Sequence, residues 1–405
     1  MALYGDLTHD SRVIREAESL AAAGHAVTIA CLAASAATID RLGPAIRVLV
    51  HQPGGNAVRP GDPSPFYAAR ASRVGRIVAR ARWLWGCWSS IARWGRGVVA
   101  AVGPVDTWHA HDLTGLEAVA PRIDRGTHVV YDSHELFLET GSATRLPGFA
   151  RRLLAWRERR LVRRCRAVIT VNPGLAEELE RRYHPARIEV VRNCPARWDP
   201  PAHRPTLIRD VLGLPSESTI LLFHGALVPG RGIGTLVNVL RSPGLEHVHL
   251  VLLGPGSLKT AEVELQPGAA ERPGSRRVHL LPAVPPEELP DWVASADIGS
   301  VMQEPLDLNL VLSTPNKLFE SIAVGTPVLA SDLPEIRRVV LGDPDGPLGV
   351  LCDPTNTASV AAALAELLAP PRRELTEMRG RCIRAADRRL NWSVESQRLL
   401  ALYDD

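Results

Sequence analysis

Short apolar runs alternate with longer amphipathic segments along nearly the whole chain. Runs such as "HVVYD" and "VHLVLLG" carry apolar, often β-branched side chains at successive positions, which favours strands buried on both faces of a parallel sheet. Segments between them, such as "SRVIREAESLAAAG", have apolar residues at helical spacing, so strands and helices alternate as in βαβ units. The pattern predicts an α/β protein with parallel sheets and strands near 2–5, 26–32, 46–50, 107–111, 128–132, 167–171, 188–193, 219–225, 248–254, 277–282, 298–302, 326–331 and 348–352.

A proline-rich passage, "NCPARWDPPAHRP" at 193–205, interrupts this alternation and is typical of an interdomain linker. The chain of 405 residues is also too long for one ordinary core. We therefore expect two doubly wound domains, 1–195 and 196–385, and a C-terminal helix within 386–405 that packs back on the first domain. Ligands of such sheets bind beyond the carboxyl ends of the strands, and the cleft between two such domains is the expected site.

Composition narrows the class of protein. The apolar share of 45% and the charged share of 22% are typical of a globular protein. The net charge of +3 is small for this length, so the composition gives no sign of nucleic-acid binding. The six cysteines are scattered without metal-ligand spacing, which suits reduced, buried thiols in a cytoplasmic protein. No signal peptide and no run of about 20 apolar residues is evident. The oligomeric state stays open, and a homodimer is compatible with the sequence.

One of only two lysines, Lys317, lies in the stretch "STPNKLFESIAVG". Pro315 suits the start of a helix, and Asn316, Lys317 and Glu320 would then share one side of its first turn. A helix N-terminus with an added ammonium suits a phosphate, and Glu320 could accept hydrogen bonds from ribose hydroxyls. The alternative is an ordinary surface Lys–Glu pair.

Several motifs, in order, carry a resemblance to a known family: "DSRVIREAESLAAAGHAVTI", "VVYDSHELF", "LLFHGALVPGRGIGTLV" and "STPNKLFESIAVGTPVLASDLPEIRRVV". The chain resembles the GT4-like retaining glycosyltransferases of the GT-B fold over nearly its whole length. The resemblance implies two facing, doubly wound, Rossmann-like domains with parallel sheets. It also implies a nucleotide-sugar donor on the second domain, an acceptor mainly on the first, and transfer with retention of anomeric configuration.

Four residues match positions to which the family assigns a role. Glu320 resembles the second glutamate of the family's E-x7-E motif, which contacts the donor ribose. Gly225 resembles the glycine at the strand end where the diphosphate approaches the backbone, and Arg231 occupies the position of the usual diphosphate-contacting lysine. His134 resembles the histidine that reaches the transferred sugar. With Lys317, Arg231 and His134 form the expected catalytic set.

The chain departs from the family pattern at the first glutamate of E-x7-E, which is Leu312 here. Glu304, Asn309 or the segment from Ser313 to Asn316 could supply the missing sugar contact. The segment "PNKLFE" resembles the motif of a subgroup that lacks this first glutamate. The loss of the glutamate therefore does not by itself indicate inactivity.

A second departure is Ala226, where the family often has an arginine. Arg231 and Lys317 would then balance most of the diphosphate charge, as preorganised cations do for a leaving group. No Asp-x-Asp motif is evident, so we expect no metal ion and no cofactor other than the nucleotide-sugar cosubstrate, linked to UDP or GDP.

Candidate acceptor-binding residues lie at strand ends of the first domain. Asp10, Ser11 and Arg12 occupy the first loop, where Ser11 is the expected helix N-cap. Asp112 follows a strand and suits helix capping better than catalysis. An isolated histidine is more often structural, but the position of His134 at the end of a parallel strand favours function.

Residues 66–102 are basic and rich in tryptophan, and two interpretations stay open. They could form an interfacial helix that docks on an anionic membrane and delivers a lipid-linked acceptor. They could instead form a first-domain helix whose aromatic face packs on the sheet or lines the acceptor pocket.

The expected function is therefore transfer of a sugar from a UDP- or GDP-sugar. Two acceptor classes stay open: a secondary-metabolite small molecule with a hydroxyl or thiol, as in antibiotic biosynthesis, and a surface glycan or lipid carrier, as in polysaccharide biosynthesis. Two alternative functions also remain, namely nucleotide-sugar binding without transfer and sugar-nucleotide epimerisation.

Overall fold

A computed structural model of the chain describes residues 1–53, 73–123, 127–140, 143, 144, 146–257, 259, 277–369 and 371–404, with only the backbone for residues 9 and 73–84. It divides the chain into two compact units, one formed by Met1–Arg192 with Ser396–Asp405 and the other by Asn193–Glu395. The division falls three residues before the expected boundary at 195, within the proline-rich passage.

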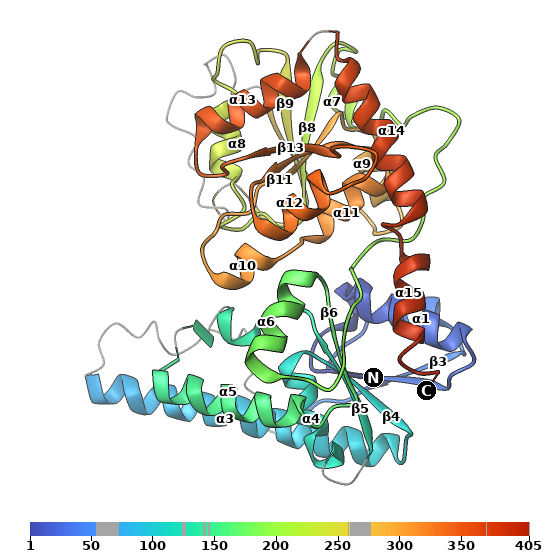
Figure 1. Ribbon diagram of the computed structural model, residues 1–405, viewed down its shortest axis with the longest axis vertical. Helices are drawn as coiled ribbons and strands as arrows, with labels where there is room; N and C mark the ends of the chain where they lie inside the picture. The colour runs from blue at the N-terminus through green and yellow to red at the C-terminus, as the bar shows by residue number, and fades with distance from the viewer. Residues whose placement is uncertain are drawn as a thin grey trace. The chain divides into compact units, whose positions relative to one another are not determined.

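The described part of the first unit contains a parallel sheet with the strand order β3-β2-β1-β4-β5-β6-β7 (Figure 1). Its strands are β1 (Ala2–Leu3), β2 (Val27–Cys31), β3 (Ile46–Val50), β4 (Thr107–His111), β5 (His128–Ser133), β6 (Ala167–Thr170) and β7 (Ile188–Val190). Its helices are α1 (Ser11–Ala22), α2 (Ala36–Leu42), α3 (Arg73–Val102), α4 (Asp112–Ile123), α5 (Gly148–Val162) and α6 (Pro173–Tyr183), with short 3-10 turns at Leu7–His9 and Phe137–Glu139.

The described part of the second unit contains another parallel sheet, with the strand order β10-β9-β8-β11-β12-β13. Its strands are β8 (Thr219–His224), β9 (Val248–Leu253), β10 (Val278–Leu281), β11 (Ile298–Val301), β12 (Val328–Ser331) and β13 (Gly349–Cys352). Its helices are α7 (Leu207–Leu212), α8 (Ile233–Val239), α9 (Leu289–Ala294), α10 (Leu308–Leu312), α11 (Asn316–Ala323), α12 (Pro334–Leu341), α13 (Thr357–Leu368) and α14 (Arg373–Arg388). The last helix of the chain is α15 (Trp392–Leu400), which begins in this unit and ends in the first.

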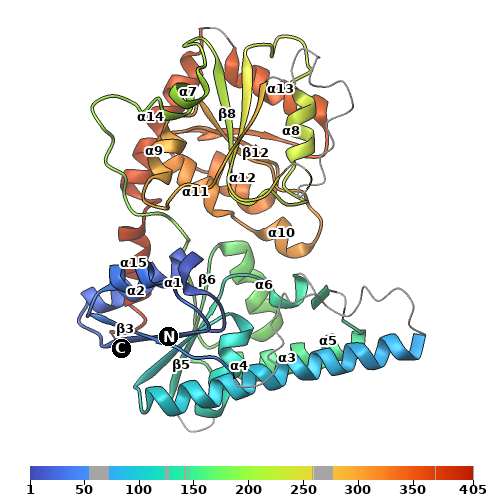
Figure 2. The same cartoon turned by 180° about the vertical axis from the view of Figure 1, so that it is seen from behind.

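Strand β8 shows why the apolar runs are continuous. Leu221 and Phe223 belong to a core cluster with residues of α8 and α13, whereas Ile220 and Leu222 pack with residues of α7 and α9. Because successive side chains point to opposite faces, a strand covered by helices on both sides needs apolar residues at every position. Helices lie on both faces of each sheet, as Figures 1 and 2 show, so the predicted parallel α/β class is confirmed.

Each sheet has one point where the strand order reverses. In the first unit it lies between β1 and β4, and in the second between β8 and β11. Chain segments leave these neighbouring strands toward opposite faces, which opens a crevice beyond their carboxyl ends. Both sets of predicted site residues lie at these two points.

The described residues include all six cysteines, which are buried and not joined in disulfides. Among the helices that the structure describes, none is both long and apolar enough to cross a membrane.

Candidate functional site

The loop after β8 brings the backbone of the second unit close to the predicted lysine. Gly225 has a φ of 108°, a conformation that favours glycine. A Cβ built on Gly225 would lie 3.8 Å from Lys317 Nζ. The first turn of α11 therefore carries Lys317 to the strand-end glycine, as the donor-site hypothesis requires.

Lys317 occupies an unusual environment for an ammonium. Its Nζ lies 3.4 Å from the centroid of the Phe223 ring, which is close enough for a cation–π contact. Burial, together with the charge of Arg231, lowers the pKa of Lys317 well below its usual value, and Glu320 offsets this only in part. Two cations thus lie near each other at the switch point, an arrangement that a bound anion would stabilise.

Arg231 is positioned by Gln303, a residue that the sequence analysis did not identify. The guanidinium donates from Nη1 to Gln303 Oε1 at 2.6 Å, and Gln303 Nε2 donates to the carbonyl of Leu310 at 3.0 Å. The same amide contacts the hydroxyl of Ser313. Gln303 lies two residues after the end of β11 and is buried, so its place beyond a strand end was the signal available in the sequence.

Glu320 lies one turn further along α11 and contacts a second residue that the sequence analysis missed. His224, the last residue of β8, has its Nε2 3.0 Å from Glu320 Oε2. Its ring is buried, and its Nδ1 has no hydrogen-bond partner within the described part of the chain. The imidazole thus fixes one oxygen of the carboxylate that is expected to contact a ribose.

The remaining donor-site candidates have different surroundings. Glu304 Oε1 accepts from the backbone N–H of Gly232 at 3.1 Å, so this carboxylate holds the loop that precedes α8. Asn309 is buried on α10. Asn316, the first residue of α11, accepts from Asn193 Nδ2 at 2.8 Å. One oxygen of the Glu304 carboxylate is thus used by this backbone contact, and which group replaces the missing glutamate stays a prediction.

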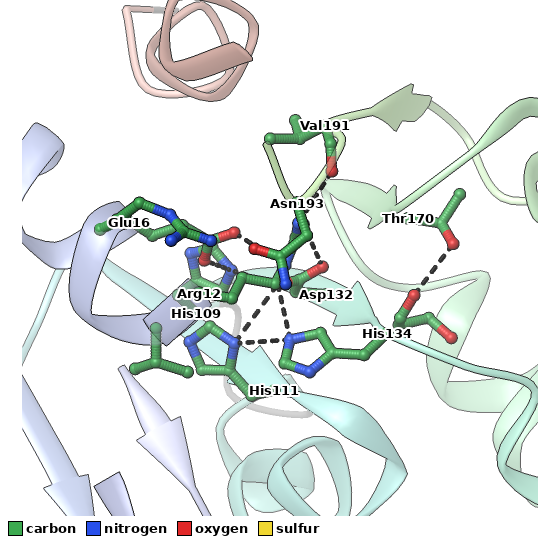
Figure 3. Close-up of polar contacts among 12 residues, drawn as sticks. Arg12, Glu16, His109, His111, Asp132, His134, Thr170, Val191 and Asn193 are labelled. Carbon is green, nitrogen blue, oxygen red and sulfur yellow. Dashed lines mark hydrogen bonds and ion pairs between the residues drawn. The ribbon is translucent and has the colours of Figure 1, made fainter. Parts of the chain in front are cut away.

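In the first unit, a buried ion pair forms the centre of a polar network (Figure 3). Arg12 donates from Nε and Nη2 to the two oxygens of Asp132, at 2.8 and 2.9 Å. Its Nη1 donates to the carbonyl of Val191 at 2.8 Å. Arg12 and Asp132 are both buried, and such two-pronged contacts are the strong form of an Arg–carboxylate pair.

His134 extends this network toward solvent. Its Nε2 lies 2.9 Å from Asp132 Oδ2 and its Nδ1 lies 3.6 Å from Asp112 Oδ2, while its side chain is 21% exposed. Burial alone would lower the pKa of His134, but Asp112 and Asp132 outweigh this effect and raise the pKa to about 10. His134 is therefore an imidazolium at neutral pH and can donate protons in hydrogen bonds, but it cannot act as a base.

The pKa values of Asp132 and Glu16 shift in opposite directions within the same cluster. Burial alone would raise the pKa of Asp132, but Arg12 and His134 hold it well below its usual value. For Glu16, burial and the charge of Asp132 raise the pKa well above its usual range. Protonation is therefore favoured on Glu16 over Asp132, and the charge of Asp132 is balanced by Arg12 and His134.

Four side chains of this cluster, Glu16, His109, His111 and Asp132, offer ligand atoms within 4.8 Å of one another, a spacing that could hold a metal ion. However, the Nε of Arg12 lies 2.8 Å from Asp132 and 3.1 Å from Glu16, which places a resident cation beside both carboxyl groups. A dication there would be repelled by that guanidinium. We therefore interpret the cluster as an ion-pair network.

The terminal segment completes the network from another part of the chain. The hydroxyl of Tyr403 lies 2.7 Å from His109 Nδ1. His109 in turn lies 3.5 Å from Glu16. Burial and the neighbouring His111 lower the pKa of His109 well below its usual value, so this imidazole is neutral.

The predicted acceptor residues separate into two groups. Asp10, and not Ser11, caps α1, because its carboxylate accepts from the N–H of Val13; the N-cap prediction was wrong by one residue. Arg12 is enclosed in the network, so the geometry does not support a direct contact with an acceptor. Asp112 begins α4 and accepts from the backbone N–H of His134 at 3.2 Å, which makes it the residue that orients His134.

The segment 66–102 was assigned two alternative interpretations. Residues 66–72 lie outside the described part of the chain. Within α3, Ile91, Trp94 and Val98 are buried, and Trp94 donates to the carbonyl of His51 at 2.9 Å. This half of α3 therefore packs inside the unit, as the second interpretation predicts.

Solved structures with similar folds define the class of protein. The Anabaena protein HepE in complex with UDP superposes with a TM-score of 0.69 at 15% identity and 99% coverage of both chains. Sucrose-phosphate synthase from Thermosynechococcus elongatus gives 0.64 at 19% identity, over 99% of this chain and 94% of that one. At such identities the likeness concerns the fold alone. The two units have the GT-B fold.

Family models then identify the family. The glycosyl transferase 4-like domain matches residues 11–194, and the glycosyl transferases group 1 domain matches residues 218–370. Together they span most of the chain, which belongs to the GT4-like glycosyltransferases.

Curated relatives agree with this family. The D-inositol 3-phosphate glycosyltransferase of Xylanimonas cellulosilytica is 34% identical over 49% of this chain and 45% of its own length. The D-inositol 3-phosphate glycosyltransferase 1 of Catenulispora acidiphila is 28% identical over 76% of this chain and 74% of its own length. The match thus spans less than half of the first of these relatives.

Proposed function

We propose that this protein is a retaining glycosyltransferase that moves a sugar from a UDP- or GDP-sugar to an acceptor. The observation that carries the proposal is the position of Lys317, which lies beside Gly225 and Arg231 at the switch point of the second unit. Two cations next to an open glycine backbone suit a diphosphate, whose negative charge grows as it leaves the sugar.

In this proposal, different residues at the switch point bind the diphosphate and the ribose of the donor. The ammonium of Lys317 and the guanidinium of Arg231 bind the diphosphate oxygens, and the backbone N–H groups at the start of α11 add to that field. Glu320, oriented by His224 at 3.0 Å, accepts hydrogen bonds from the ribose hydroxyls. These groups supply the positive charge, so we propose that transfer requires no metal ion.

His134 has a separate role in the proposal. As an imidazolium held by Asp112 and Asp132, it donates a hydrogen bond to an oxygen of the transferred sugar and cannot serve as the base or nucleophile. The acceptor would lose its proton to the leaving diphosphate, which balances the charge of the leaving group. The acceptor class stays open between small molecules and glycan or lipid carriers, and D-inositol 3-phosphate is the first small molecule to test because relatives carry it in their names.

The test is incubation with UDP- and GDP-sugars, with release of the nucleoside diphosphate as the readout. We expect one nucleotide to be released, with activity that survives chelation by EDTA and falls by at least about a hundredfold in Lys317→Ala. Lys259→Ala, at the other lysine of the chain and on an exposed site, is the matched control. Consumption of no nucleotide sugar would contradict the proposal.

The substitution of the first motif glutamate by Leu312 favours one alternative, which is binding without transfer. That alternative predicts tight UDP or GDP binding by calorimetry but no nucleotide release with any acceptor. An epimerase would convert the sugar nucleotide without releasing the nucleoside diphosphate, so analysis of the sugar product distinguishes the third possibility.

A further inference from the structure

Helix α5 leaves an apolar stripe uncovered. Phe149, Leu153 and Trp156 are exposed by 73%, 61% and 56%. Their spacing of four and three residues places them on one face of the helix. Single exposed apolar side chains are ordinary, but three in register on one helix indicate a surface that contacts something else.

The charged residues exposed on α5 are all arginines. Arg152, Arg159 and Arg160 are exposed, and the guanidinium of Arg160 lies 5.8 Å from the Trp156 ring centroid. The single acidic residue of the helix, Glu158, is buried and accepts hydrogen bonds from two tyrosine hydroxyls. The outer surface of α5 is thus apolar and cationic, with no exposed carboxylate of its own.

A groove continues this surface toward α3, which lies beside α5 in both views (Figures 1 and 2). The groove has a volume of about 760 Å³ and lies between α3, α4 and α5. Most of its lining consists of apolar side chains and arginines, among them Trp88, Val99, Arg96, Arg122, Trp156 and Arg160. The acidic residue in this lining, Glu117, is paired with Arg157. Such a lining suits an amphiphile that has an apolar chain and an anionic head.

We propose that α5 and this groove dock on an anionic lipid bilayer. A helix with an apolar face bordered by arginines lies in the interface between headgroups and acyl chains, and anionic lipids strengthen its binding. This surface overlaps only in part with the segment 66–102 that the sequence suggested. Helix α3 contributes lining residues of the groove, but its Ile91, Trp94 and Val98 are buried, and the exposed apolar stripe belongs to α5.

The main competing occupant is a second copy of the chain. A two-fold symmetric contact would place this face against itself, and the arginines of α5 would then meet one another. Like charges at close range oppose such a contact, whereas anionic headgroups complement them. Charge complementarity therefore favours the bilayer.

The test is co-sedimentation of the full chain with phospholipid vesicles. We expect binding to vesicles of phosphatidylcholine mixed with phosphatidylglycerol, weaker binding at high salt, and little binding to phosphatidylcholine alone. Leu153→Ser should lower the partition coefficient roughly tenfold, because the variant lacks the apolar side chain that would be buried in the bilayer. Arg159→Ser should lower binding to the mixed vesicles but leave the weak binding to phosphatidylcholine unchanged.

Two matched controls lie in the second unit. Val211 on α7 is 60% exposed, nearly the same as Leu153, so Val211→Ser controls for the loss of an exposed apolar side chain. Arg241→Ser, also at an exposed position, controls for the loss of one positive charge. Each variant is first checked by circular dichroism, so that only folded protein is compared.

Three results would overturn the proposal: no binding of the wild-type protein to the mixed vesicles, equal losses in the controls, or a concentration-dependent dimer that Leu153→Ser dissociates without any vesicle binding. The last result would assign the face to contact between copies. Nucleotide release is measured separately in solution, so failure of vesicle binding leaves the proposed transferase function untouched.

Discussion

The two units place polar clusters at equivalent points of their sheets, but the clusters differ in how their charges are satisfied. In the first unit, Arg12 and Asp132 form a buried, two-pronged pair, and His134 lies between two carboxylates. In the second, Lys317 and Arg231 lie near each other, and burial and this mutual repulsion lower the pKa of Lys317. The charges of the first cluster are paired, whereas in the second Glu320 only partly offsets the two basic groups.

The difference indicates what each unit does before a ligand arrives. A balanced network fixes its side chains in one geometry, and so presents His134 in a set orientation and protonation state. Two basic groups that Glu320 only partly offsets raise the free energy of the empty site, and a bound diphosphate lowers it. Preorganisation therefore describes the first unit, whereas the second depends on its ligand for electrostatic balance.

The largest expected effect comes from removing the cation of the balanced cluster. Arg12→Gln leaves Asp132 buried without its main partner, and should lower the free energy of unfolding by about 3–5 kcal/mol. Urea denaturation followed by circular dichroism measures this. Arg373→Gln breaks an exposed pair with Glu377 and should leave stability unchanged within error. Equal losses in the two variants would mean that the network is not a balanced, buried unit.

The pH dependence of stability tests the imidazolium of His134. Because the folded-state pKa is raised to about 10, above the unfolded value of about 6.5, His134 stabilises the fold fully below about pH 6.5. This contribution is lost as pH rises through about 10. Denaturation midpoints of the wild type should therefore fall more steeply over that window than those of His134→Gln. Parallel profiles would show that His134 is not held as a cation.

In the second unit, Lys317→Ala should weaken UDP or GDP binding by about 1.5–3 kcal/mol, the contribution of a hydrogen bond to a charged group. Stability should not fall, because the substitution also removes a repulsion with Arg231. Isothermal titration calorimetry measures the affinity, with Lys259→Ala as control. Unchanged affinity in Lys317→Ala would contradict the proposed difference between the two units, because the second cluster would then not be an anion site.

Proton uptake on nucleotide binding is a second test of the difference between the two clusters. A diphosphate near Lys317 raises its lowered pKa back toward the ordinary value. Binding should therefore take up protons in the pH range over which Lys317 of the empty site loses its own proton, and should strengthen as pH falls through that range. Titrations in buffers with different ionisation enthalpies give the number of protons. Lys317→Ala should abolish most of the uptake, whereas His134→Gln should not alter it, because His134 is already protonated.

The smallest expected effect concerns the ribose contact. Glu320→Gln keeps the shape of the side chain but replaces a charged acceptor, and should weaken nucleotide binding by about 1 kcal/mol. The same variant should bind free inorganic pyrophosphate as tightly as the wild type does, because pyrophosphate has no ribose. An equal loss for both ligands would place Glu320 on the diphosphate instead.

Much of the fold was predictable from local patterns. Continuous apolar runs gave the strands of both sheets within one to three residues at either end, because parallel strands covered on both faces need apolar side chains throughout. The N-cap of α1 was misplaced from Asp10 to Ser11, since both residue types cap helices equally well. Local chemistry did not distinguish them, and only the backbone angles did.

The candidate site was predictable where a motif lies within one element. The grouping of Asn316, Lys317 and Glu320 follows from helical spacing alone. The partners Gln303 and His224 were missed, because each lies at a different strand end and only that position, without a motif around it, pointed to the site. Glu304 was a candidate on sequence position, but its carboxylate turns to the N–H of Gly232, a contact between two loops.

The sequence by itself therefore determined the α/β class, the order of the strands along the chain, and the helix that carries Lys317, because periodicity and propensity act over neighbouring residues. Only the tertiary structure decided the protonation states. Arg12, Asp132 and Tyr403 are far apart in the chain, and whether a group is charged depends on what the folded chain buries beside it. Tertiary packing likewise decided that Ile91, Trp94 and Val98 of α3 are buried while Phe149, Leu153 and Trp156 of α5 remain exposed.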